Sequence, residues 1–197
     1  MFALGLTGSI ATGKSTVLSM FAALGVPVFS ADAAVHALYR GAAVPVVAEL
    51  FPAIVHKGEI DRQALGKLVL NDPAALERLE KAVHPLVRAR LAAFLAEAKS
   101  TGAPLAVVDI PLLFESGHDY GLDAVAVTAA APETARARAR ARPGMDGEKL
   151  DAILARQLPQ AEKLQRADYV IDTGGPLEAT RAAVAALVAT LTGKAAP

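Results

Sequence analysis

Hydrophobic residues lie along this chain in short continuous runs rather than in an alternating pattern. Runs that are apolar throughout are typical of strands in a parallel sheet, because helices cover both faces of such a sheet. Helix-compatible stretches separate most of the runs, and this alternation predicts a doubly wound α/β fold with right-handed crossovers. The five expected strands are residues 2–6, 26–29, 105–109, 124–128 and 169–171.

A long gap, residues 32–103, separates the second run from the third and contains no convincing strand. Glycines and prolines divide it into several helical stretches. Asn71 or Asp72 is placed to cap a helix that has Pro73 in its first turn and runs to about residue 82, and another helix is expected from Pro85 to about residue 99. We interpret residues 35–103 as a helical insertion that covers a substrate.

A second insertion follows the fourth run, where Ala and Arg alternate from residue 135 to residue 142. Both residue types are strong helix formers, so we expect a helix with Arg138 and Arg142 one turn apart on one face. Pro143 and Gly144 end this helix. Further helices are expected at residues 148–156, 159–166 and 176–191, followed by a frayed tail at 192–197.

The length of 197 residues suggests one compact domain with insertions. We assign residues 1–34, 104–134 and 158–197 to a nucleotide-binding core, residues 35–103 to a substrate-binding insertion and residues 135–157 to a lid. Because 53% of the residues are hydrophobic, the chain has enough apolar material for a proper core.

Charge and cysteine content exclude several function classes. The formal net charge is zero, so bulk attraction to nucleic acid or to an acidic membrane is not expected. The chain has no cysteine, which excludes disulfides, thiolate nucleophiles and zinc-cysteine sites, and its four histidines lack metal-ligand spacing. We expect neither a signal peptide nor a membrane span, and therefore a cytoplasmic protein.

The strongest chemical signal is the segment from Gly8 to Ser15, which fits the phosphate-binding pattern G-x-x-x-x-G-K-[ST] between an expected strand and an expected helix. Glycines let successive backbone N–H groups point into one nest, and the helix N-terminus adds partial positive charge. Lys14 is expected to reach the β- and γ-phosphates of a nucleotide, and the Ser15 hydroxyl to help hold Mg²⁺. The expected ATP-binding residues of this loop are Gly8, Ser9, Ile10, Ala11, Thr12, Gly13, Lys14, Ser15 and Thr16.

Two aspartates lie at the carboxyl ends of expected strands, the edge where a parallel α/β sheet binds its ligands. Asp32 could accept a proton from an attacking hydroxyl or bind Mg²⁺ through water, or it could simply cap the following helix, a role that Ser30 could equally fill. Asp109 ends a run of four apolar residues in the manner of a Walker B strand, whose Asp holds the Mg²⁺ shell.

The arginine series has three interpretations. A nucleic-acid patch would need interleaved aromatic residues or a basic surplus, and neither is present. A solvated basic face is the second. The third, which we favour, is a lid whose arginines clamp ATP phosphates, with Arg142 as the catalytic arginine and Arg138 as a second ATP contact.

Two further segments are candidates for acceptor binding. The loop Pro111-Leu112-Leu113-Phe114-Glu115 follows Asp109 directly and either contacts an acceptor or packs under the helical insertion. His84 stands before Pro85 at an expected helix start, where it is either structural or a substrate contact.

Taken together, these motifs resemble the dephospho-CoA kinase family over nearly the whole chain. The joint presence of the phosphate loop, Asp32, His84-Pro85 and Pro111 to Glu115 is specific, and Gln157, Lys163 and residues 167–172 match the family's C-terminal pattern. This chain has Ser30 where the family has the first acid of an Asp-Ala-Asp element, and Thr173 where the family usually has Asn.

The resemblance implies an ATP- and Mg²⁺-dependent kinase that phosphorylates the ribose 3′-hydroxyl of dephospho-CoA, the last step of coenzyme A synthesis. Asp32 would be the base, with Lys14 and Arg142 as the other catalytic residues; His84 and the loop 111–115 would bind the substrate. We expect a monomer or weak oligomer without nucleic-acid or membrane partners.

Three other functions compete with this interpretation. The nearest is another small-molecule P-loop kinase acting on a nucleotide or a sugar. A GTP-driven switch usually reads guanine with an Asn-Lys-x-Asp element, and the single asparagine, Asn71, is followed by Asp72 instead. A nucleic-acid-binding ATPase is disfavoured by the zero net charge.

Overall fold

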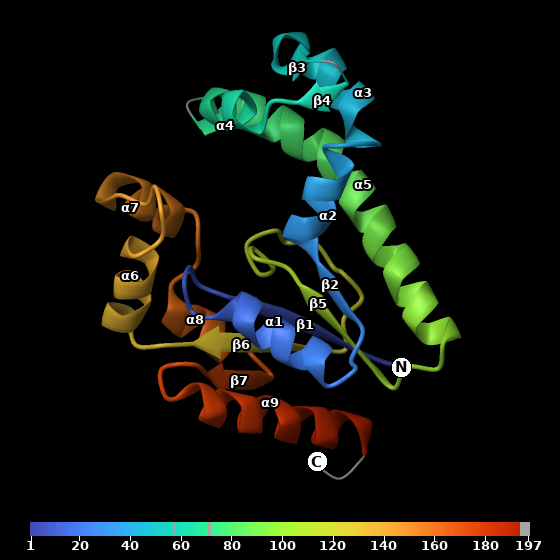
Figure 1. Cartoon of the computed structure of the whole chain (residues 1–197), viewed down its shortest axis with the longest axis vertical. Coiled ribbons are helices and arrows are strands. Elements are labelled where there is room, and N and C mark those ends of the chain that lie inside the picture. Colours follow the sequence, from blue (N-terminus) through green and yellow to red (C-terminus); the bar gives the residue numbers. More distant parts are fainter. Residues whose placement is uncertain (57, 71, 194–197) are drawn as a thin grey trace. The chain divides into compact units, whose positions relative to one another are not determined.

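The computed structural model describes residues 1–56, 58–70 and 72–193 (Figure 1). Among these residues, five strands form one sheet in the spatial order β2-β5-β1-β6-β7. Strand β1 pairs in parallel with β5 on one side and β6 on the other, and β6 pairs in parallel with β7. The expected doubly wound α/β fold is confirmed. The strands are β1 (Phe2–Gly8), β2 (Val28–Ser30), β5 (Leu105–Asp109), β6 (Ala124–Ala129) and β7 (Tyr169–Asp172).

The chain divides into two compact units, Met1–Val28 with Glu97–Pro197, and Phe29–Ala96. In the first unit, helices α1 (Lys14–Ala23) and α9 (Leu177–Thr192) pack against each other and against the sheet. Their apolar side chains and those of the central strands form one core, which includes Leu4, Leu6, Val17, Phe21, Leu105, Val107, Ile171 and Val184. The central strands β5, β1 and β6 are therefore largely buried, as expected for a parallel sheet, whereas the edge strands β2 and β7 are partly exposed.

The second unit has a core of its own, built from Leu38, Val47, Phe51, Ile54, Ile60, Leu65, Leu79 and Val83. Its elements are α2 (Ala31–Leu38), α3 (Ala43–Leu50), the 3₁₀ turn η1 (Pro52–Ile54), β3 (Val55–His56), β4 (Glu59–Ile60), α4 (Arg62–Leu70) and the first part of α5 (Pro73–Ser100). The short antiparallel pair β3–β4 contradicts the expectation of no strand in this region. Two-residue strands leave no periodic signal in a sequence.

The expectation of two helices separated at His84-Pro85 is wrong, because α5 runs without interruption through Pro85. Proline costs about 3 kcal/mol in a helix interior. The buried side chains of Leu79 and Val83, with Leu86 and Val87 packed beside them, supply tertiary stabilisation that offsets this cost. Of the two candidate caps, Asp72 accepts hydrogen bonds from the N–H groups of Ala74 and Ala75 at 2.9 and 3.0 Å; Asn71 lies outside the described residues.

The arginine-rich segment forms α6 (Pro132–Arg140), which is followed by α7 (Gly147–Ala155) and α8 (Gln160–Gln165). The expectation that one helix carries both Arg138 and Arg142 is wrong, because α6 ends at Arg140 and Arg142 lies beyond it. The N–H of Arg142 bonds Ala139 O at 3.1 Å in a tighter turn. Pro143 explains this ending, since the residue before a proline is pushed out of the helical region.

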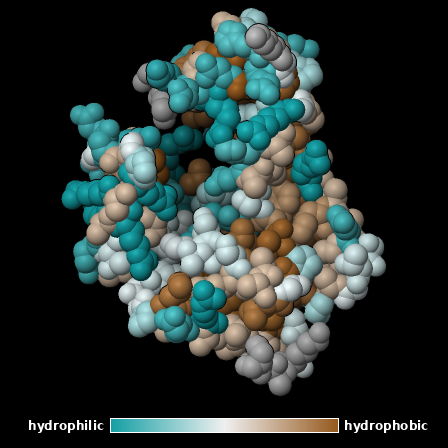
Figure 2. Space-filling view, in the orientation of Figure 1, coloured by the Kyte–Doolittle hydropathy of each residue, from teal (hydrophilic) through white to brown (hydrophobic). Residues whose placement is uncertain are grey.

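The exposed surface of α6 and α7 is largely hydrophilic (Figure 2). In these two helices only Ala139 and Leu150 are buried, and both pack against Ala11 of the phosphate loop. Few residues of α6 and α7 therefore pack against the rest of the protein. No helix in the described part of the chain is both long enough and apolar enough to cross a membrane.

Candidate active site

The loop between β1 and α1 has the backbone of a phosphate nest. Gly13 has a φ of +82° at the start of α1, and Ala11 has a φ of +60°, a conformation in which non-glycine residues are strained. A side chain at Gly8 would collide with the hydroxyl of Thr128. No side chain caps α1, so its first N–H groups stay available for an anion.

Two buried hydroxyl groups, Thr12 of the loop and Thr128 of β6, hold this loop in place. Thr12 Oγ1 donates to Ser9 O at 2.8 Å, and the Thr128 hydroxyl lies 2.8 Å from Thr12 Oγ1. Because the single Thr12 proton is used on Ser9 O, the Thr128 hydroxyl donates to Thr12. Both threonines are at most 1% exposed. The loop is therefore fixed from below by buried hydrogen bonds, which is the preorganisation that anion binding requires.

Lys14 and Asp109 are brought together at the loop, where they form an ion pair. Asp109 ends β5 and is 3% exposed; the Lys14 side chain is 13% exposed. The structure places its ammonium against the carboxylate that the Walker B pattern marked for the Mg²⁺ shell.

A cavity of about 430 Å³ opens beside the phosphate loop. Its volume lies within the range of small-molecule sites. Arg138 and Arg142 both line it, although they do not share a helix, and Arg138 Nη2 donates to Thr173 O at 2.8 Å. Two cationic side chains thus face a loop of N–H donors. The other lining residues are Ala11, Gly13, Thr16, Val17, Thr173, Gly175, Leu177 and Thr180.

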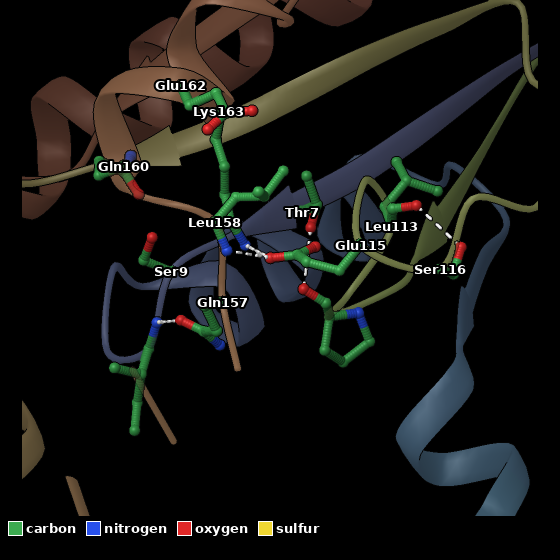
Figure 3. A network of polar contacts seen from close by, with 12 residues as sticks. Thr7, Ser9, Leu113, Glu115, Ser116, Gln157, Leu158, Gln160, Glu162 and Lys163 are labelled. Atoms are coloured by element: carbon green, nitrogen blue, oxygen red, sulfur yellow. Dashed lines mark hydrogen bonds and ion pairs between the residues drawn. The ribbon is translucent and has the colours of Figure 1, made fainter. Parts of the chain in front are cut away.

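The loop that follows β5, residues 111–115, is held in place by contacts with other parts of the protein. Glu115 Oε1 lies 2.7 Å from Nζ of Lys163, a residue of α8 with no exposed surface, and accepts the N–H of Leu158 at 2.8 Å (Figure 3). Thr7 Oγ1 donates to Pro111 O at 3.1 Å, and the Arg166 guanidinium lies 5.9 Å from the ring centroid of Phe114. The Glu115 carboxylate is thus engaged with the protein itself.

Gln157 connects the end of α7 with the phosphate loop. Its Oε1 accepts the N–H of Ile10 at 2.9 Å (Figure 3). Nearby, Gln160 Nε2 donates to Thr128 O at 3.0 Å. The segment after α7 therefore touches the loop directly and the strand behind it. These contacts were missed by sequence reasoning; the only signal for Gln157 and Lys163 was their match to the family's C-terminal pattern.

The other two predicted site residues lie in the unit Phe29–Ala96. Asp32 is exposed in the first turn of α2, and Ser30 caps this helix by accepting the N–H of Ala33 at 3.3 Å. Ser30, and not Asp32, is therefore the residue that caps α2. His84 is exposed in the middle of α5. Within the described residues, no three His, Asp or Glu side chains gather as a metal-binding group.

We expect Glu115→Gln to destabilise the protein at neutral pH. Burial alone would raise the pKa of Glu115, but its hydrogen bonds with Lys163 and with the Leu158 N–H outweigh burial, so the pKa lies below its usual range. A lowered pKa stabilises the fold above the unfolded pKa and loses this effect as pH falls through the folded value. Removing one partner of a buried ion pair costs about 3–5 kcal/mol.

Urea unfolding of the wild type and Glu115→Gln at pH 7 and below about pH 4, where a free glutamate protonates, measures this difference. The free-energy gap should shrink at the lower pH. An equal gap at both values would mean that the charge of Glu115 is irrelevant to stability.

Comparison with known proteins matches this site to one family. The sequence model of dephospho-CoA kinase matches residues 2–178. A relative named dephospho-CoA kinase, from Rhodopseudomonas palustris strain BisB18, is 54% identical over 186 residues, 94% of each chain. The crystal structure of TT1252 from Thermus thermophilus aligns with a TM-score of 0.82 at 39% identity over 98% of each chain. Dephospho-CoA kinase from Campylobacter jejuni aligns with a TM-score of 0.69 at 26% identity over 97% of each chain. With this coverage and this site, the chain belongs to the dephospho-CoA kinase family.

Proposed function

We propose that this kinase transfers the γ-phosphoryl group of ATP to the ribose 3′-hydroxyl of dephospho-CoA, giving CoA and ADP, the final step of coenzyme A synthesis. The observation that carries the proposal is the phosphate loop with Lys14 and Asp109 at its edge and two arginines across the adjoining cavity, in a chain that the family model matches over residues 2–178. No observation favours a nucleotide or sugar as the acceptor.

Phosphoryl transfer depends on positioning and on neutralising charge more than on covalent chemistry. The N–H groups of the loop and of the first turn of α1 hold the phosphates, and the Lys14 ammonium binds the β- and γ-phosphates. In the structure Lys14 neutralises Asp109. We infer that the phosphates compete with the Asp109 carboxylate for this ammonium when ATP binds.

The residues present fit a magnesium ion. Ser15 is exposed in the first turn of α1, and Asp109 supplies a carboxylate at the same loop; hydroxyl, carboxylate and phosphate oxygens are the ligands Mg²⁺ prefers. Ser15 would hold the ion directly, with Asp109 or Asp32 through water. When bound, Mg²⁺ supplies neutralisation of the phosphate charge. The protein's own groups then orient the acceptor and remove its proton.

Asp32 is proposed as the general base that orients and deprotonates the 3′-hydroxyl. Its carboxylate is exposed and is not used as a helix cap. Arg142 and Arg138 are proposed to clamp the phosphates, with Arg142 neutralising the charge that develops during transfer. We assign acceptor binding to the insertion 35–103 with His84, and to the loop Pro111–Glu115. The Glu115 carboxylate holds this loop in place through its contacts with Lys163 and Leu158.

We propose that residues 135–157 form a lid that closes on ATP. Few of their side chains are buried, and segments with few core contacts are the ones that move in enzymes. Hydrogen exchange with and without a non-hydrolysable ATP analogue should show new protection in this segment. If protection is confined to the phosphate loop, the arginines form a static basic face.

Acceptor fragments test the proposed chemistry. The 3′-hydroxyl must come within about 3 Å of the base for proton transfer, so the adenosine end of the substrate must bind deepest. Adenosine-containing fragments without pantetheine should be phosphorylated more weakly than dephospho-CoA, and ³¹P NMR should place the new phosphate on the 3′ oxygen. Inert fragments together with good turnover of gluconate, or transfer to the 5′-phosphate of adenylate instead of its 3′ oxygen, would contradict the proposal. A cytoplasmic location and a monomer or weak oligomer stay predictions.

A further inference from the structure

Thr173 lies directly after β7 and is 7% exposed. Its hydroxyl oxygen lies 2.8 Å from Thr12 O of the phosphate loop and 2.9 Å from Ala129 O at the end of β6. A threonine hydroxyl has one proton to donate. Ala129 O already accepts the N–H of Thr173 at 2.8 Å. We therefore assign the hydroxyl proton to the carbonyl of Thr12.

The rest of the Thr173 side chain lies against Gly13. A Cβ atom built on Gly13 would come within 3.3 Å of both Cβ and Cγ2 of Thr173. Gly13 has a φ of +82° and directly precedes Lys14. Thr173 thus holds the two loop residues, Thr12 and Gly13, that set where α1 begins and where the Lys14 side chain starts.

The backbone of Thr173 contacts the arginine-rich segment. Its carbonyl accepts the hydrogen bond from Arg138 Nη2 at 2.8 Å, and both residues line the cavity beside the phosphate loop. One residue therefore joins the phosphate loop, the end of the sheet and an arginine of α6 at the wall of one cavity.

We propose that Thr173 is a positioning residue for ATP: its hydroxyl fixes the Thr12 carbonyl so that the following N–H groups and Lys14 meet the phosphates. This inference rests on the proposed function, whose nucleotide site it deepens. Thr173 acts through the loop and touches no reacting atom. Its effect should therefore fall on ATP and not on dephospho-CoA.

Thr173→Val tests the hydroxyl alone, because valine has nearly the shape of threonine. Losing one hydrogen bond to a buried carbonyl should weaken ATP binding about tenfold. Thr173→Ser keeps the hydroxyl and should stay within about twofold of the wild type. The KM for dephospho-CoA should be unchanged in both variants. Isothermal titration with ATP in the absence of acceptor, combined with steady-state kinetics, measures both quantities.

Two comparisons guard against a general loss of stability. Thr192→Val removes a threonine hydroxyl that donates to Val188 O at 2.8 Å at the far end of α9, and ATP binding should not change. If Thr173→Val folds poorly, Thr173→Ser and Thr173→Ala form a second pair that differs only in the hydroxyl, and only the alanine variant should bind ATP weakly.

Three results would overturn the inference: wild-type ATP affinity in Thr173→Val, equal weakening in the valine and serine variants, or a matching rise in the KM for both substrates. Failure of the proposed function looks different. In that case the wild type leaves dephospho-CoA unphosphorylated. Calorimetry on the Thr173 variants still measures how much the hydroxyl contributes to ATP binding.

Discussion

Lys14→Ala should lower kcat/KM by about 10³-fold or more, because the loss of one preorganised cation at a developing charge costs at least this order of rate. The variant should also lose stability. Its partner Asp109 is 3% exposed, and removing one partner of a buried ion pair costs about 3–5 kcal/mol. Activity must therefore be measured at a temperature at which the variant is folded.

The double variant Lys14→Ala/Asp109→Asn separates the two effects of Lys14. A neutral amide at position 109 needs no cation, so the double variant should regain much of the lost stability. It should remain inactive, since nothing restores the ammonium at the phosphates. Recovery of activity along with stability would show that Lys14 only stabilises the fold, and the assignment of the phosphate loop would then be wrong.

Asp32→Asn should lower kcat by about 10²–10⁴-fold, the usual effect of removing a general base. The KM for ATP should change little, because the carboxylate acts on the acceptor hydroxyl. The fold should be unaffected, since Ser30 caps α2 and Asp32 is exposed. Ser30→Ala is the matched control: it should cost about 1 kcal/mol of stability as a lost helix cap and leave the chemistry to Asp32.

Steady-state kinetics at saturating concentrations of both substrates distinguishes the two variants. If Asp32→Asn keeps most of its kcat, the base lies elsewhere in the chain. If Asp32→Asn instead melts at a much lower temperature, its role is structural.

The elements of the core could be predicted because each leaves a local signal. Strand β5 is a run of four apolar residues that ends in Asp109, and the phosphate loop has its glycines and Lys14 at fixed spacing. Both follow from the chemistry of residues adjacent in sequence: continuous burial for a parallel strand, and backbone N–H groups directed at phosphate.

The remaining features depend on contacts between residues far apart in the chain. Pro85 predicts a helix boundary locally, and α5 passes through it because its side chains pack into the core of the second unit. Glu115 and Lys163 are 48 positions apart, and nothing near either residue indicates that they form a buried ion pair. The contact of Thr173 with Thr12 spans 161 positions, and no local pattern in the sequence indicates it.

A coupled assay of ADP release tests the central claim most directly. The protein is mixed with ATP and Mg²⁺ and offered dephospho-CoA, nucleoside monophosphates other than adenylate, gluconate or no acceptor in parallel. The account predicts rapid ADP release with dephospho-CoA and only background rates with the others. Equal or faster release with a nucleoside monophosphate or gluconate, or ADP release that does not depend on any acceptor, would contradict it.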